Sequence, residues 1–166
     1  MGVKVKHTTK HDGIPGMIKN MKLVKGSGVE VGVLKGEHAW LAGIHEYGCT
    51  MTVTNKQRRF MKARYGILLG KKLTIPERSF LRAGYDANRD KVMRKAQMVL
   101  KDVASGKTTA RGCYQAVGIE LRDRIKDYAV DLSSPPNSSF TVGQKGSSNP
   151  LVASGEMIDG ITWRKA

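Results

Sequence analysis

The stretch from Phe80 to Leu132 reads FLRAGYDANRDKVMRKAQMVLKDVASGKTTARGCYQAVGIELRDRIKDYAVDL and contains two long segments with helical periodicity. Apolar side chains recur every three or four residues on both sides of a break at Ser105, which is the spacing of helices with one buried face. Either hydroxyl of the pair Thr108–Thr109 can cap the second segment. The spacing therefore predicts helices over 80–104 and 107–131 that pack together as a hairpin.

Shorter helical and strand patterns occupy the rest of the chain. Apolar residues at helical spacing predict helices over 14–23 and 38–47, the second ending at Gly48. We expect the strands to form one small antiparallel sheet packed against the helical hairpin, so the predicted fold class is α+β. Alternating or β-branched runs predict these strands over 29–34, 49–54, about 139–143 and 161–165.

We expect a single folded domain, because 166 residues fit the usual size of one unit. Residues 1–12 are polar and basic, and they are expected to form a flexible arm. Residues 13–166 would then form the α+β domain, interrupted by two extended loops. The loop at 55–73 is basic, and the loop at 133–149 is rich in Ser, Pro, Gly and Asn.

The chain is strongly basic: 29 Lys and Arg against 14 Asp and Glu give a formal net charge of +15. Such a surface attracts polyanions, because cations placed near phosphates release condensed counterions. The loop at 55–73 has no acidic residue, and it points to DNA or to an acidic protein surface. The residues expected to face DNA are Lys56, Arg58, Arg59, Lys62, Arg64, Lys71 and Lys72.

No motif for catalysis, nucleotide binding or metal binding is present, so we expect neither an enzyme nor a bound cofactor or metal. His38 and His45 lie seven residues apart, too far along one short helix to bind one ion. Cys113 falls on an apolar stripe and is expected to be buried, whereas Cys49 starts a strand. Residues 1–10 are polar and basic with no apolar segment behind them, so we expect no signal peptide, and no apolar run has the length of a membrane span.

Three motifs lie in the same order along the chain. Ala42–Gly48 (AGIHEYG) ends a helix before a β-branched strand, and Ile75–Arg82 (IPERSFLR) opens the first long helix. Asn149–Met157 (NPLVASGEM) precedes the terminal strand that contains Trp163. This order resembles the neck and tail-completion (minor tail) proteins of long-tailed bacteriophages, including the Mu-type virion morphogenesis group. The resemblance spans roughly residues 29–165.

The resemblance implies a structural virion protein of the head–tail junction, assembled in the host cytoplasm. Its subunits would form a ring, which we expect to be hexameric, around the channel for genome DNA. A head-closure or connector protein would lie on one side, and a tail-terminator or tail-tube protein on the other. Ring neighbours would dock through Phe140, Val142, Leu151, Ile161 and Trp163. The alternative is a non-enzymatic, basic nucleic-acid-binding module that acts as a monomer or dimer.

Two features of the motifs carry structural expectations of their own. Arg78 lies at a helix start, where the helix dipole disfavours a cation, so we expect it to have an acidic partner. The terminal strand would lie at a sheet edge. It would either receive a strand from a ring neighbour or close the protein's own sheet.

Overall fold

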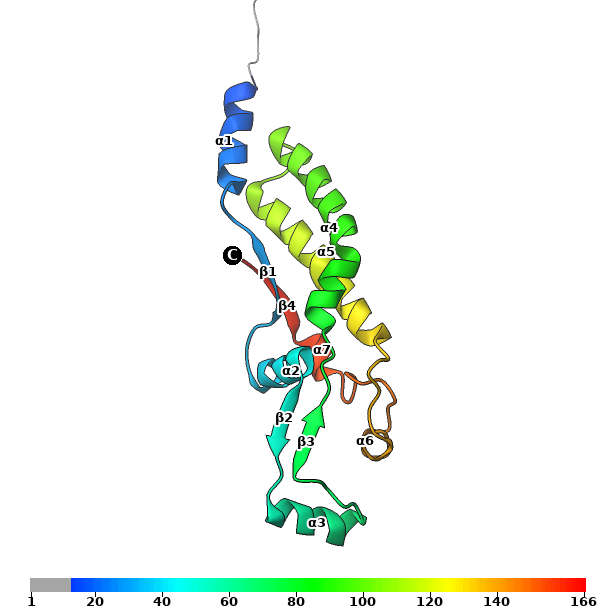
Figure 1. The fold of residues 1–166 in the computed structure, drawn as a ribbon. Coiled ribbons are helices and arrows are strands. Elements are labelled where there is room, and N and C mark those ends of the chain that lie inside the picture. Colours follow the sequence, from blue (N-terminus) through cyan, green and yellow to red (C-terminus); the bar gives the residue numbers. More distant parts are fainter. Residues whose placement is uncertain (1–12) are drawn as a thin grey trace, which may run out of the picture.

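The computed structural model describes residues 13–166, and the expected arm at 1–12 lies outside the described residues. The molecule is elongated, with α1 (Ile14–Val24) at one end and α3 (Asn55–Tyr65) at the other (Figure 1). The predicted hairpin is confirmed: α4 (Phe80–Ala104) and α5 (Ala110–Asp131) pack against each other along the upper half. The hydroxyl of Thr109 caps α5 by accepting a hydrogen bond from the backbone N–H of Gly112.

The terminal strand closes the chain's own sheet. β1 (Val29–Val33) pairs antiparallel with β4 (Ile161–Lys165), so that Val33 lies opposite Ile161. Both strands contact α5, which covers the face of this sheet. β1, which follows α1, and β4, at the C-terminal end, therefore meet near the middle of the molecule (Figure 1).

The prediction of one four-stranded sheet is wrong, because the strands of residues 13–166 form two separate pairs. β2 (Cys49–Thr52) pairs with β3 (Lys72–Ile75) rather than with β1. This second pair projects away from the hairpin and carries α3 at its far end (Figure 1). The α+β class holds, whereas the single sheet does not.

Both expected loops contain helices. The loop at 55–73 holds α3 and the start of β3, because Thr54 and Gln57 form a reciprocal capping box and Gly66 ends the helix in the left-handed conformation. The strand expected near 139–143 is instead α6 (Ser139–Lys145). The Ser138 hydroxyl accepts from the backbone N–H of Thr141 and starts this helix.

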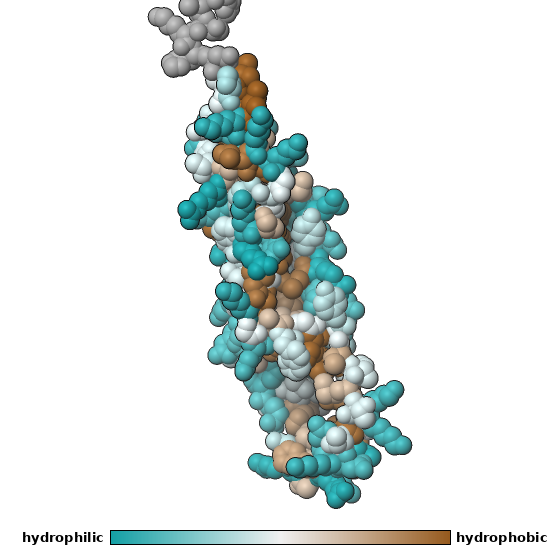
Figure 2. Space-filling view, turned by 90° about the vertical axis from the view of Figure 1, so that its left-hand side faces the viewer, coloured by the Kyte–Doolittle hydropathy of each residue, from teal (hydrophilic) through white to brown (hydrophobic). Residues whose placement is uncertain are grey.

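The remaining elements cover the two ends of the core. α2 (Glu37–Tyr47) ends at Gly48, as predicted, and contacts both α4 and the short α7 (Glu156–Asp159). α1 contacts the far ends of α4 and α5, and Figure 2 shows apolar side chains gathered along it. The buried core is formed by Ala42, Phe80, Val92, Leu121, Ile125, Ala129, Leu151, Met157, Ile158 and Ile161.

Candidate functional site

The predicted basic residues come together at the end of the molecule formed by α3 and the β2–β3 pair. Lys56, Arg58, Arg59, Lys62 and Arg64 lie on α3, Lys71 precedes β3, and Lys72 lies in β3. All seven are exposed. We call this end, residues 49–75, the basic tip.

Cations of the basic tip face water rather than acidic neighbours. No Asp or Glu occurs between Tyr47 and Pro76. Among the described residues, none of the ion pairs involves a cation of the tip. The local potential is therefore positive, and a polyanion can approach without displacing an acidic partner.

One face of α3 carries three of these cations side by side. Arg58, Arg59 and Lys62 line a shallow hollow of about 270 Å³ together with Asn55 and two leucines. Arg58 is held in place, because its Nε donates to the carbonyl oxygen of Leu69 at 2.9 Å. Positively charged side chains on one helix face suit contacts to phosphates, which carry no sequence information.

The first two motifs meet where α2 ends and α4 begins. Glu46, the penultimate residue of α2, is only 2% exposed. Its carboxylate accepts from the backbone N–H groups of Leu81 and Arg82 at 2.8 and 3.1 Å, and from the hydroxyl of Ser79 at 3.0 Å. The Arg82 Nε adds a fourth bond at 2.9 Å. Glu46 therefore caps α4 from a different helix, and sequence analysis missed this role.

Arg78 has no acidic partner among the described residues, so that expectation is wrong. The side chain is 4% exposed and donates to the carbonyl oxygens of Pro135 and Pro136 at 2.8 and 3.0 Å. It also donates to Oδ1 of Asn137 at 3.2 Å, and Nη1 lies 3.3 Å from Nδ1 of His45. Burial lowers the pKa of its guanidinium. Neutral oxygens thus take the place of a carboxylate, and Arg78 ties the segment before α6 to the start of α4.

The neutral form of His45 is favoured at this junction. Burial, followed by the charges of Arg78 and Lys145, lowers the pKa of His45 from 6.5 to about 4. A neutral ring can accept from Arg78 at Nδ1, whereas a protonated ring cannot.

We therefore expect a pH-dependent loss of stability that originates at His45. The unfolded chain binds the proton first, so this contribution is complete above about pH 6.5 and is lost as the pH falls towards 4. His45→Asn keeps an acceptor near Nδ1 but does not titrate. In urea unfolding the stability advantage of the wild type over this variant should shrink between pH 6.5 and 4. A difference that is independent of pH would contradict the expectation.

The third motif is anchored by Asn149. Its Oδ1 accepts from the backbone N–H groups of Leu151 and Val152 at 2.8 and 2.9 Å, and its Nδ2 donates to the carbonyl oxygen of Val130. Lys145 donates to the carbonyl oxygens of Asn149 and Pro150. All three motifs therefore build one structural junction around the core.

The residues expected at a subunit interface divide into two groups. Leu151 and Ile161 are buried in the chain's own core, so they offer no surface to a neighbour in this fold. Phe140, Val142 and Trp163 are partly exposed, and their role in docking stays a prediction. Trp163 already packs against Gly118 of α5.

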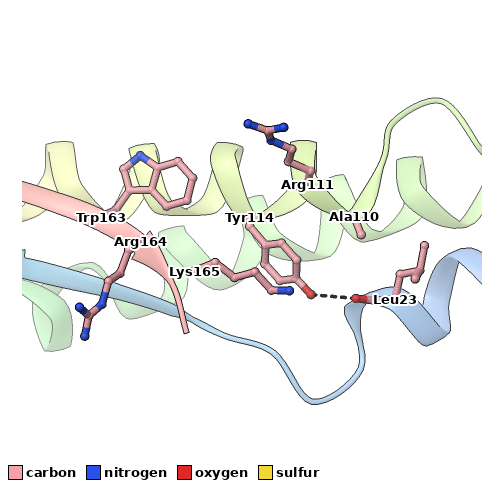
Figure 3. Close-up of a pocket in the computed structure, with 7 residues that line it drawn as sticks. All are labelled: Leu23, Ala110, Arg111, Tyr114, Trp163, Arg164 and Lys165. Carbon is pink, nitrogen blue, oxygen red and sulfur yellow. Dashed lines mark hydrogen bonds between the residues drawn. The ribbon is translucent and has the colours of Figure 1, made fainter.

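A second hollow, of about 540 Å³, lies between α1, α5 and β4 (Figure 3). Its aromatic side chain Tyr114 donates to the carbonyl oxygen of Leu23 at 3.1 Å, and Nζ of Lys165 lies 5.0 Å from the ring centre. Arg164 is paired with Glu30. Two of the cations here therefore have internal partners, and the hydroxyl of Tyr114 links α5 to the end of α1.

No group of three or more His, Cys, Asp or Glu in residues 13–166 lies close enough to hold a metal ion. Cys113 is buried, as predicted, and burial raises the pKa of its thiol. No helix in this part of the chain is both long enough and apolar enough to cross a membrane.

Comparison of the chain with models of known protein families, with curated proteins and with solved structures finds no match.

Proposed function

We propose that the protein is a structural component of a phage head–tail junction, with subunits arranged in a ring around DNA. One observation carries the proposal: an elongated subunit presents seven exposed cations at one end, in a stretch without acidic residues (Figure 1). A ring of such subunits would surround its channel with positive charge. Contacts to the phosphates of DNA would then be independent of sequence.

The three motifs support the proposal through the shape of the subunit. Glu46 and Arg78 fix how α2, the start of α4 and residues 135–137 meet. This junction sets the direction in which the basic tip projects from the helical hairpin. A ring requires this rigidity, because each subunit must present two different patches in a constant geometry.

Two measurements test the proposal. Electron microscopy and native mass spectrometry of the purified protein should show a closed ring, with six subunits expected. In an assembled particle, cross-links from the basic tip should reach DNA. A species that stays monomeric or dimeric while it binds DNA would favour the alternative of a basic nucleic-acid-binding module.

We predict that DNA binding depends on the cationic face of α3. Replacing Arg58, Arg59 and Lys62 by Gln should reduce the slope of log affinity against log salt by up to about 2.7, because each phosphate contact contributes about 0.9. The fold should be unchanged, since α3 has no buried residue. Fluorescence anisotropy of labelled duplexes over a salt series measures this slope.

The matched control removes the same charge elsewhere. Arg89, Lys91 and Arg94 are exposed on α4, and their replacement by Gln lowers the net charge by the same amount. If both triple variants reduce the slope equally, the total charge of the protein drives binding and the basic tip has no special role.

A further inference from the structure

The basic tip also contains an apolar groove on the side of α3 opposite its cationic face. The groove has a volume of about 560 Å³ and lies between α3, the β2–β3 pair and α6. Its lining includes Val53, Phe60, Met61, Leu69 and Leu73. We propose that this groove binds an acidic amphipathic helix of a partner protein. The inference goes beyond the proposed function, because it requires neither a ring nor DNA.

The lining has the composition of a groove that accepts a helix. Eight of its twelve lining residues are apolar, and two of these are the methionines Met51 and Met61. Methionine is flexible and polarisable, so it adapts to the side chains that a bound helix inserts. Helices bind such grooves through apolar anchors spaced at i, i+3, i+4 and i+7.

Aromatic contacts hold one wall of the groove in place. The ring of Tyr65 contacts Phe140 of α6 edge-on at a centroid distance of 5.2 Å, and it contacts Phe60 in the same manner at 6.2 Å. α3 and α6 are therefore linked, although they lie far apart in the sequence. The groove exists in the folded subunit before any partner arrives.

Charge determines which helix fits. The two segments that frame the groove, residues 47–76 and 132–155, contain no Asp or Glu at all. Arg64 follows Met61 by three residues and Phe60 by four, so it lies on the groove side of α3. Lys72 lies directly opposite Thr52, which lines the groove. A bound helix therefore meets an apolar floor with a cationic border, which complements acidic side chains on its flanks.

A second copy of this chain fits the groove poorly. α1 has the required apolar stripe, with Met17, Ile18 and Met21 exposed, but its polar positions carry Lys19 and Lys22 and no acid. Its lysines would face the cationic border. Single-stranded DNA is also a poor fit, because only two of the twelve lining residues, Phe60 and Phe140, have aromatic rings on which bases could stack.

The test uses the full-length protein and two synthetic helical peptides that share one leucine stripe. One peptide has Glu at every flanking position, and its twin has Lys there. By fluorescence anisotropy the Glu peptide should bind at least about tenfold more tightly than the Lys twin. Equal binding of the two peptides would overturn the proposal.

Two pairs of variants locate the binding site. Leu73→Ser, in the groove, should weaken the Glu peptide about tenfold. Leu68→Ser should not weaken it, because Leu68 lies outside the groove. Leu68 is also the more exposed of the two leucines, at 77% against 41% for Leu73, so exposure alone cannot explain a difference. Arg64→Gln should weaken binding about fivefold, whereas Arg59→Gln on the opposite face of α3 should have no effect. The Arg64 pair leaves the β2–β3 pairing intact, so it remains informative if Leu73→Ser disturbs the strand.

Other occupants have distinct outcomes. Oligothymidine is tested as a competitor for the same site. If it displaces the Glu peptide, and if Leu73→Ser weakens the binding of oligothymidine about tenfold as well, the groove binds nucleic acid and the proposal is overturned. Tighter binding of a peptide with the α1 sequence than of the Glu peptide would identify a contact between copies and overturn it as well. The salt-dependence test of DNA binding changes Arg58, Arg59 and Lys62, which do not line the groove. A negative outcome there would therefore not alter the result of the peptide-binding test.

Discussion

Replacing Glu46 by Ala is expected to lower the free energy of unfolding by about 3–5 kcal/mol, because several donors lose their acceptor at about 1–3 kcal/mol each. The carboxylate is buried and satisfies two backbone N–H groups at the start of α4, together with the hydroxyl of Ser79. Alanine leaves these donors without an acceptor, and an unsatisfied buried donor costs more than a hydrogen bond gains. Urea denaturation followed by circular dichroism measures the loss.

Glu77 supplies the matched control. It also pairs with Arg82, at 2.8 Å, but both side chains of that pair are more than half exposed. Glu77→Ala should leave stability nearly unchanged, because exposed ion pairs contribute little. Equal losses for the two variants would mean that Glu46 acts only as a charge near Arg82 and not as the cap of α4.

The long helices were predictable because their signals are local. Over more than twenty residues, the spacing of apolar side chains in α4 and α5 distinguishes a helix from a strand, and Thr109 marks a start. α3 and α6 carried equally local signals in the pairs Thr54–Gln57 and Ser138–Thr141. The composition of these segments outweighed the caps, so that the sequence predicted a loop over 55–73, with a helix weighed only around Phe60 to Tyr65, and a strand near 139–143.

Strand pairing was not predictable, because a strand pattern shows that a face is buried but not which strand covers its edge. β1 and β4 are separated by most of the sequence, whereas β2 and β3 are separated by the segment that contains α3. The sequence contains no turn signal that joins β1 to β4. The β1–β4 pair is covered by α5, which contacts both strands, and this contact also leaves no local pattern in the sequence.

In the candidate site, too, local features could be predicted from the sequence, whereas contacts between distant segments could not. The cationic face of α3 could be predicted from the absence of acidic residues between Tyr47 and Pro76. The apolar groove on the opposite side of α3 could not be predicted, because this groove depends on the contact between Phe140 of α6 and Tyr65 of α3. The partners of Arg78 were also hidden, since backbone carbonyl groups leave no pattern in the sequence.

Replacing Gly118 by Val is expected to cost about 3 kcal/mol or more, the upper range for overfilling a packed site. A Cβ atom at Gly118 would lie 2.5 Å from Cδ2 and Cε3 of Trp163, well inside van der Waals contact. Cγ of Trp163 would also lie only 2.8 Å away, and the pairing of β4 with β1 at Val31 holds the backbone of Trp163 in place, so a small shift of the indole ring does not relieve the clash. Gly43→Val is the control: this glycine also lies within a helix, but no atom lies within 4 Å of its added Cβ.

The same variant bears on the predicted docking role of Trp163. If α5 is the partner of Trp163, Trp163→Ala should cost much less in the Gly118→Val background than in the wild type, because the contact is already broken. In a Trp40→Phe background, which removes the other tryptophan, the emission of Trp163 should also shift to longer wavelength when Gly118 is changed. If the stability costs of the two substitutions are additive and the emission spectrum of the isolated subunit is unchanged, the indole of Trp163 does not pack on α5. Trp163 would then be available to a neighbouring subunit.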